Sequence, residues 1–340
     1  TVALAAGFVL AAPAVLRAAA GLLAAAVGLL AAAALFSLAR APRRHAALLG
    51  MALALLALLV AAGLGLWLLA GHGWPQVLLR RGVLTDLHAT WALLGWIGIL
   101  VSGVAFQVVP MFQMTPEYPG WLTRTLNGTV FAALLLATAG LLWPAARVLE
   151  LCGGLLLAAG SLLFAVVTLD LQRRRKRRLA DVTLDFWRLA MGVLLVLVAT
   201  WVAGRLWPPL AADPRLQLLL GGLFLLGYAL SVVNGMLYKI VPFLVWFHLQ
   251  NRLVQGQLMA SGHRVPNMKQ VLPPAWTRRQ FVLHCAVVAL TPPALWWPGA
   301  CAWLLALALA ASMAVLLRNL VSAARLYRSQ LATLEALAAA

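Results

Sequence analysis

The sequence predicts an all-α protein, a polytopic bundle of transmembrane helices. Of its 340 residues, 64% are hydrophobic and only 10% are charged, whereas a soluble domain carries about 25% charged residues. The apolar residues form long runs, and a run of about 20 residues is enough for a helix to cross the hydrocarbon core of a bilayer. Lysine and arginine gather in the short stretches between the runs. A chain with so few charges cannot cover a water-facing surface, so we expect lipid to be its main solvent.

About ten helices are expected, one for each apolar run. The runs are residues 1–16, 18–39, 46–70, 86–113, 121–143, 145–171, 186–207, 215–248, 280–297 and 299–322. Pro144, Pro208, Pro209 and Pro298 stand at their boundaries, where proline commonly begins or ends a helix. The first run is shorter than a membrane span. We therefore expect native residues to precede Thr1.

The basic residues predict the orientation of the chain in the membrane. With the start in the cytoplasm, the even-to-odd connections and the tail carry most of them, which places them inside. The densest group is expected to contact anionic lipid headgroups, and consists of Arg173, Arg174, Arg175, Lys176, Arg177 and Arg178. We expect a bacterial inner-membrane protein with a cytoplasmic C-terminus. Nucleic-acid binding is not expected, because the basic residues do not form one continuous surface.

An internal repeat divides the chain. The segment LLGWIGILVSGVAFQVVPMF (93–112) is similar to LLGYALSVVNGMLYKIVPFL (225–244). The predicted parts are residues 1–40, the last two helices of a truncated first repeat; 41–172, a four-helix repeat; and 173–340, a second four-helix repeat with a cytoplasmic tail. Three such units would give twelve helices in the full protein.

The matched segments pair several residues with structural meaning. Gly103 pairs with Gly235, and small residues let membrane helices approach closely, so both long helices are expected in the bundle interior. Pro110 pairs with Pro242, and each proline removes a backbone donor. Packing with a kink explains this pattern, while a hinge or cavity at matched places in a transporter is the alternative.

Few ionisable or strongly polar groups lie within the apolar runs, where they are functional candidates. Two roles are considered for His88. It is either an axial heme ligand or proton-handling group, or an interfacial histidine that is hydrogen-bonded to Asp86 or water. His284 is expected one to two turns into its helix, hydrogen-bonded across helices. Lys239 and Gln107 are equivalent in the repeat; Lys239 would conduct protons, hold an anion, or extend to water at the inner face.

Motifs of known catalytic chemistry are absent from the sequence. It has no CxxCH heme attachment, Walker loop, GxGxxG after a strand, or HExxH. The three cysteines lie in apolar runs without metal-ligand spacing. No catalytic or metal-binding residue is predicted.

The segments DLHATWALLGWIGILVSGVAFQVVPMF (86–112) and NGMLYKIVPFLVWFHLQ (234–250) resemble the heme-copper oxidase subunit I superfamily, particularly its divergent bacterial members. The resemblance implies a twelve-helix architecture and heme b, in respiratory, nitric-oxide or metal-related physiology. It also implies copper-binding histidines on the helix of His88 and on the next helix. His88 lies too near the helix end for that role, and the next helix has no histidine, so oxygen reduction is not expected. His88 remains a candidate heme ligand.

Three functions are therefore considered. The leading hypothesis is a membrane protein resembling that superfamily, without its copper site, that binds heme b and is not an enzyme. The second is a permease for a small solute or ion, for which the matched prolines argue. The third is a structural or assembly partner of a respiratory complex.

Overall fold

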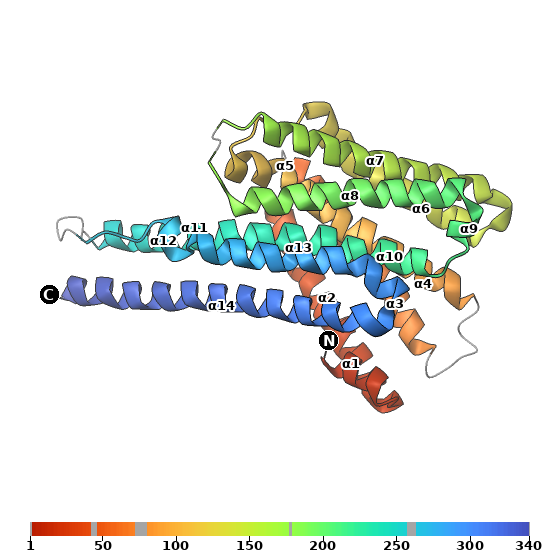
Figure 1. Ribbon diagram of the computed structural model, residues 1–340, viewed down its shortest axis with the longest axis horizontal. Coiled ribbons are helices and arrows are strands. Elements are labelled where there is room, and N and C mark those ends of the chain that lie inside the picture. The colour runs from red at the N-terminus through yellow and green to blue at the C-terminus, as the bar shows by residue number, and fades with distance from the viewer. Residues whose placement is uncertain (1, 42–45, 72–79, 177–178, 257–262, 340) are drawn as a thin grey trace. The chain divides into compact units, whose positions relative to one another are not determined.

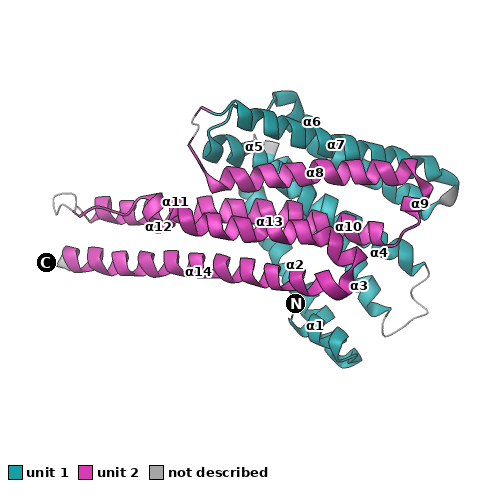
Figure 2. Ribbon diagram, viewed as in Figure 1, with its two compact units in different colours: residues 1–175 teal, residues 176–340 magenta. Residues whose placement is uncertain are grey.

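The computed structural model describes residues 2–41, 46–71, 80–176, 179–256 and 263–339, and these residues form helices without any strand. They divide into two compact units, residues 1–175 and 176–340 (Figure 2). The all-helical prediction is confirmed for the described part of the chain.

Unit 1 is built from two N-terminal helices and a four-helix group (Figure 1). Its elements are α1 (Val2–Val9), α2 (Pro13–Arg40), α3 (Ala46–Ala70), α4 (Arg81–Thr90), the π-helix η2 (Trp91–Gly98), α5 (Ile99–Gln113), α6 (Gly120–Leu142), the 3-10 turn η3 (Pro144–Ala146) and α7 (Arg147–Arg173). The segments α4, η2 and α5 form one continuous helix of residues 81–113. This helix packs on α3, and α6 pairs with α7.

Unit 2 has a similar order of elements. They are α8 (Val182–Leu206), α9 (Pro208–Ala211), α10 (Arg215–Gly222), the π-helix η4 (Leu223–Ala229), α11 (Leu230–Gln255), α12 (Met268–Val271), α13 (Pro274–Trp296) and α14 (Pro298–Ala339). Here α10, η4 and α11 form the long continuous helix, which packs on α8, and α13 pairs with α14.

Eight helices of the described chain are long and apolar enough to cross a membrane, judged by length and composition. The pattern is compatible with an integral membrane protein, as predicted. Two of the ten expected spans are not among these eight. α1 is only eight residues long, and α13 carries Gln280, His284, Thr291 and two consecutive prolines, which lower its hydropathy.

Several helix boundaries differ from those expected. The second helix begins at Pro13 and continues through Arg17, whereas the apolar runs predicted a break at Arg17 between residues 1–16 and 18–39. α14 continues to Ala339, so the predicted tail is helical rather than a separate segment. Pro144, Pro208 and Pro298 begin elements, as predicted for boundary prolines. Pro110 and Pro242 lie inside continuous helices.

Close contacts at glycine hold the long helix of unit 1 against α3. A Cβ atom added to Gly95 would lie 2.8 Å from the Cβ of Ala57. A Cβ added to Gly103 would lie 3.0 Å from the Cα of Gly50. Neither glycine leaves room for a side chain, so the backbone of the long helix packs directly on α3 at these points, as the sequence predicted for Gly103.

The long helix of unit 2 meets α8 in the same way. A Cβ atom on Gly227 would lie 2.8 Å from Cγ1 of Val193, and one on Gly235 would lie 2.8 Å from the Cβ of Phe186. In both units the glycines are eight residues apart and the residues that they touch are seven apart. Each unit thus has an antiparallel helix pair with contacts in the same register.

A further common feature was not predicted. The π-helical segments η2 and η4 each begin two residues before the matched sequence segments. A π-helix has wider turns than an α-helix, is rare, and often lies at a functional site. No residue type in either segment predicts it.

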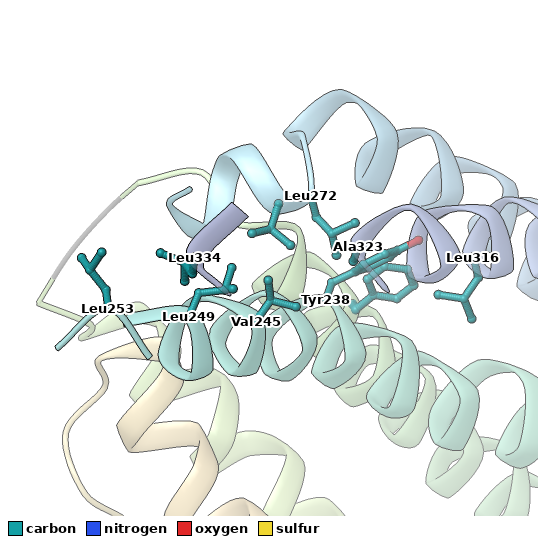
Figure 3. Packing of buried hydrophobic residues seen from close by; sticks show 10 residues of the cluster. Tyr238, Val245, Leu249, Leu253, Leu272, Leu316, Ala323 and Leu334 are labelled. Atoms are coloured by element: carbon teal, nitrogen blue, oxygen red, sulfur yellow. The ribbon is translucent and has the colours of Figure 1, made fainter. Parts of the chain in front are cut away.

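The C-terminal half of α14 packs on the end of α11. A buried apolar cluster joins Val245, Leu249 and Leu253 of α11 to Ala323 and Leu334 of α14. Leu272, which follows α12, lies between the two helices at this place (Figure 3). The connection after α11 leads through α12 to α13. Its described part is ordered by packing on α11 and α14.

The contact between Gly50 and Gly103 gives a testable prediction. In Gly50→Ala the new Cβ would lie 2.8 Å from the Cα of Gly103 and 2.6 Å from Nδ2 of Asn127. We expect a loss of about 1–3 kcal/mol in the free energy of unfolding, because overpacking forces the helices apart. Reversible unfolding in mixed micelles would measure it.

The matched control is Gly63→Ala, on the same helix with nothing within 4 Å of the added atom. This variant should be unchanged or more stable by up to about 1 kcal/mol, since alanine favours the helix. Equal destabilisation of both variants would contradict the close contact.

Candidate functional site

His88 of unit 1 lies on α4, directly before the π-helix, and its ring is held by α3. Its Nδ1 atom is 2.8 Å from the carbonyl oxygen of Ala61. Because a carbonyl can only accept a hydrogen bond, Nδ1 carries the proton, which leaves the lone pair on Nε2. The partner of Nδ1 is therefore the carbonyl of Ala61, which neither of the two predictions for His88 named. A neutral imidazole oriented in this way is suited to ligate a metal ion through Nε2.

Gly65 provides the space for this ring. A Cβ atom added to Gly65 would lie 2.8 Å from Cε1 of His88 and 3.1 Å from its Nδ1. The imidazole thus packs directly on the backbone of α3 at residue 65 and bonds the carbonyl one turn earlier, at residue 61. Two independent contacts fix its orientation.

No cluster of histidine, cysteine, aspartate or glutamate that could hold a metal ion exists among the residues that the structure describes. His45 and His72 lie outside those residues. His88 is the one described histidine of unit 1. Among the described side chains, unit 1 therefore offers a single imidazole as a candidate heme ligand.

Lys239 and Gln107 are in different environments, although they are equivalent in the repeat. Lys239 Nζ donates to Asp181 Oδ2 at 2.9 Å, and both side chains are about one-quarter exposed. Asp181 also caps α8 by accepting from the backbone N–H of Thr183. Gln107 is exposed. Extension to water was one of the three roles considered for Lys239 from the sequence, and none of the three included an ion pair.

His284 of unit 2 is fully buried, and its Nε2 lies 2.8 Å from the hydroxyl oxygen of Ser231. This contact between α13 and α11 agrees with the expected hydrogen bond across helices. The depth was underestimated, however. α13 begins at Pro274, so His284 lies nearly three turns into the helix.

The predicted headgroup contacts lie in the connection between α7 and α8. Arg174 pairs with Asp170 at 2.6 Å, and both are half-exposed. Arg173 and Lys176 are exposed, whereas Arg177 and Arg178 lie outside the described residues. Charged side chains at this place remain available to lipid phosphates.

The sequence analysis did not identify the polar side chains that are buried inside each unit. In unit 1, Ser102 donates to Asn127 at 2.6 Å, and Gln172 donates to Gln113 at 3.0 Å. In unit 2, both polar atoms of Asn234 and the indole N–H of Trp187 are buried without a partner. The pairing of Ser102 with Asn234 in the repeat was the available signal, since it places a polar residue at matching positions inside both bundles.

The bond between Ser231 and His284 yields a second prediction. Ser231→Ala leaves Nε2 of a fully buried histidine without its partner, and an unsatisfied buried group costs about 1–3 kcal/mol. We expect the free energy of unfolding to fall by that amount. Ser37→Ala is the control, because that hydroxyl is exposed and bonds only within its own helix. A change below about 0.5 kcal/mol in both variants, typical of surface substitutions, would contradict the role of Ser231.

Comparisons with known proteins were made at the levels of family, sequence and structure. No family model, no curated protein and no solved structure matches the chain. Its function must therefore be argued from its own residues.

Proposed function

We propose that this integral membrane protein resembles heme-copper oxidase subunit I, lacks the copper site, and binds heme b through His88. The observation that carries the proposal is the geometry of the imidazole. Nδ1 donates its proton to the carbonyl of Ala61 at 2.8 Å, so Nε2 keeps the lone pair with which an imidazole binds iron. A hydrogen bond from the second ring nitrogen to a carbonyl is the usual support of a ligating histidine, and it increases the basicity of the ligating nitrogen.

The heme would supply one-electron redox chemistry when bound. The chain's own contribution would be to hold the imidazole. The carbonyl of Ala61 fixes the tautomer, and the bare backbone at Gly65 admits the ring. In unit 2, Leu220 stands at the position that matches His88, so the proposed ligand belongs to unit 1 alone.

The common contacts of the two units support the proposed architecture. Gly95 and Gly103 touch α3 in the register in which Gly227 and Gly235 touch α8. Each unit then adds a hairpin, α6–α7 or α13–α14. These features favour a duplicated four-helix unit.

Visible spectroscopy tests the heme proposal. Protein purified from cells supplied with heme precursor should have a Soret band, and His88→Ala should abolish it because the Nε2 donor is lost. Gly65→Ala should weaken or shift the band, because the added Cβ displaces the ring.

Two controls separate ligation from general damage. His248→Ala removes an exposed histidine, and Gly63→Ala adds a Cβ in open space on α3; both should keep the wild-type spectrum. A folded wild-type protein without a Soret band, or an unchanged band in His88→Ala, would refute the proposal.

A second candidate function is a permease for a small solute or ion. Each long helix combines a π-helical segment with an interior proline, at Pro110 in one and Pro242 in the other. Irregular backbone at matched places in two repeats is typical of transporter binding regions, because it frees carbonyl and N–H groups inside the bundle.

Vesicle flux assays test this alternative. Pro242→Ala should slow transport by restoring a regular helix, and Lys239→Ala should do so by breaking the ion pair with Asp181. Lys269→Ala, which removes an exposed side chain of α12, is the control and should leave flux unchanged. If neither Pro242→Ala nor Lys239→Ala alters the flux of any tested solute, this function is excluded.

A further inference from the structure

The interior of unit 2 contains polar side-chain atoms that have no partner in the protein. They are Asn234 Nδ2 and Oδ1, His284 Nδ1, Trp187 Nε1, Gln280 Oε1 and Thr183 Oγ1. All five side chains are at most 1% exposed. Buried polar groups in native proteins are nearly always hydrogen-bonded to protein or ordered water. Six unpartnered atoms in one unit therefore require an explanation.

These atoms belong to helices that touch one another. Gly235, next to Asn234, packs against the turn of α8 that holds Thr183 and Trp187: an added Cβ would lie 3.4 Å from Trp187 Cδ1. Ser231, one turn before Asn234, bonds to His284. Thus α8, α11 and α13 all contribute to the same region.

Gln280 extends this region to α14. It lies one turn before His284 on α13 and donates through Nε2 to Ser312 at 2.9 Å, so only its carbonyl oxygen is free. Hydrogen-bonding groups from four helices are therefore gathered inside one bundle.

The counterparts of these side chains in unit 1 are bonded directly to one another. Ser102, the counterpart of Asn234, donates to Asn127 at 2.6 Å, and the indole N–H of buried Trp91 donates to Thr138 at 2.9 Å. Unit 1 thus joins these side chains by direct bonds between helices and leaves three buried polar atoms without a partner, Asn127 Nδ2, Gln113 Nε2 and Gln172 Oε1, against six in unit 2. The larger number of such atoms in unit 2, on helices that touch one another, argues for an occupant there.

The donor set defines the chemistry of the occupant. It offers N–H donors from Asn234 and Trp187, and carbonyl acceptors from Asn234 and Gln280. No ionised group is among the five residues, and the nearby Lys239 is neutralised by Asp181. A cation would lack a carboxylate, and an anion would lack a positive partner, so neither would be compensated inside the membrane.

We propose that Asn234, Trp187, His284, Gln280 and Thr183 form an intramembrane site for small uncharged hydrogen-bonding molecules, with water as the simplest. Such a molecule satisfies a donor and an acceptor at once, and buried water typically makes about three hydrogen bonds. Thr183 lies two residues from the partly exposed Asp181, so the site reaches towards the surface at the start of α8. This proposal is independent of heme binding at His88.

Radiolytic hydroxyl-radical labelling of the full-length protein in nanodiscs, with oxygen-18 water as the probe, tests the site. Hydroxyl radicals formed from bound water label the side chains next to it, even when these are buried. We expect several-fold more oxygen-18 on Trp187 than on Trp91, which is equally buried but has its indole bonded to Thr138. This comparison needs no variant.

The variant Asn234→Leu removes both polar atoms at similar volume and should reduce labelling of Trp187 several-fold. Asn127→Leu, the control in unit 1, should leave labelling of Trp187 unchanged. Labelling of Trp187 no greater than that of Trp91, or labelling that persists undiminished in folded Asn234→Leu, would overturn the proposal.

Discussion

The close packing of a long helix, at its glycines, on the helix before it is the constraint on which each unit depends. Lipid offers no hydrophobic drive for helices to associate, so packing at small residues must supply it. Gly95 and Gly103 provide two such points in unit 1, and Gly227 and Gly235 provide two in unit 2. With these helices in contact, the remaining hairpin of each unit has a defined surface on which to pack. The orientation of His88 and the burial of Asn234 both follow from this arrangement.

The two units differ in how their buried polar side chains are hydrogen-bonded. Unit 1 joins its buried polar side chains by direct bonds, such as the bond from Ser102 to Asn127, and leaves three of their atoms without a partner. Unit 2 places larger hydrogen-bonding side chains in its interior and leaves several of their atoms without a protein partner. A duplicated framework permits this divergence, because one copy can keep its packing while the other gains polar residues. The proposed roles of the units differ accordingly, with a ligating histidine in one and a polar site in the other.

Much of the fold could be predicted from the sequence, because apolar runs and prolines act locally. The helical class and the boundaries at Pro144, Pro208 and Pro298 follow directly. The site was less predictable. The acceptor for His88 is a backbone carbonyl, which has no residue signature, and its space comes from Gly65 on another helix. The π-helices arise from hydrogen-bond registry, which periodicity does not encode.

The length of α14 has a mechanical consequence. Its 42 residues correspond to about 63 Å of helix, while the hydrocarbon core is about 30 Å thick. Roughly half of the rod must therefore project beyond the lipid tails, and the buried contacts of Leu334 and Ala323 with α11 brace that half. A change in the tilt of this helix in the bilayer would move its C-terminal half, and with it the α12 segment that packs beside it.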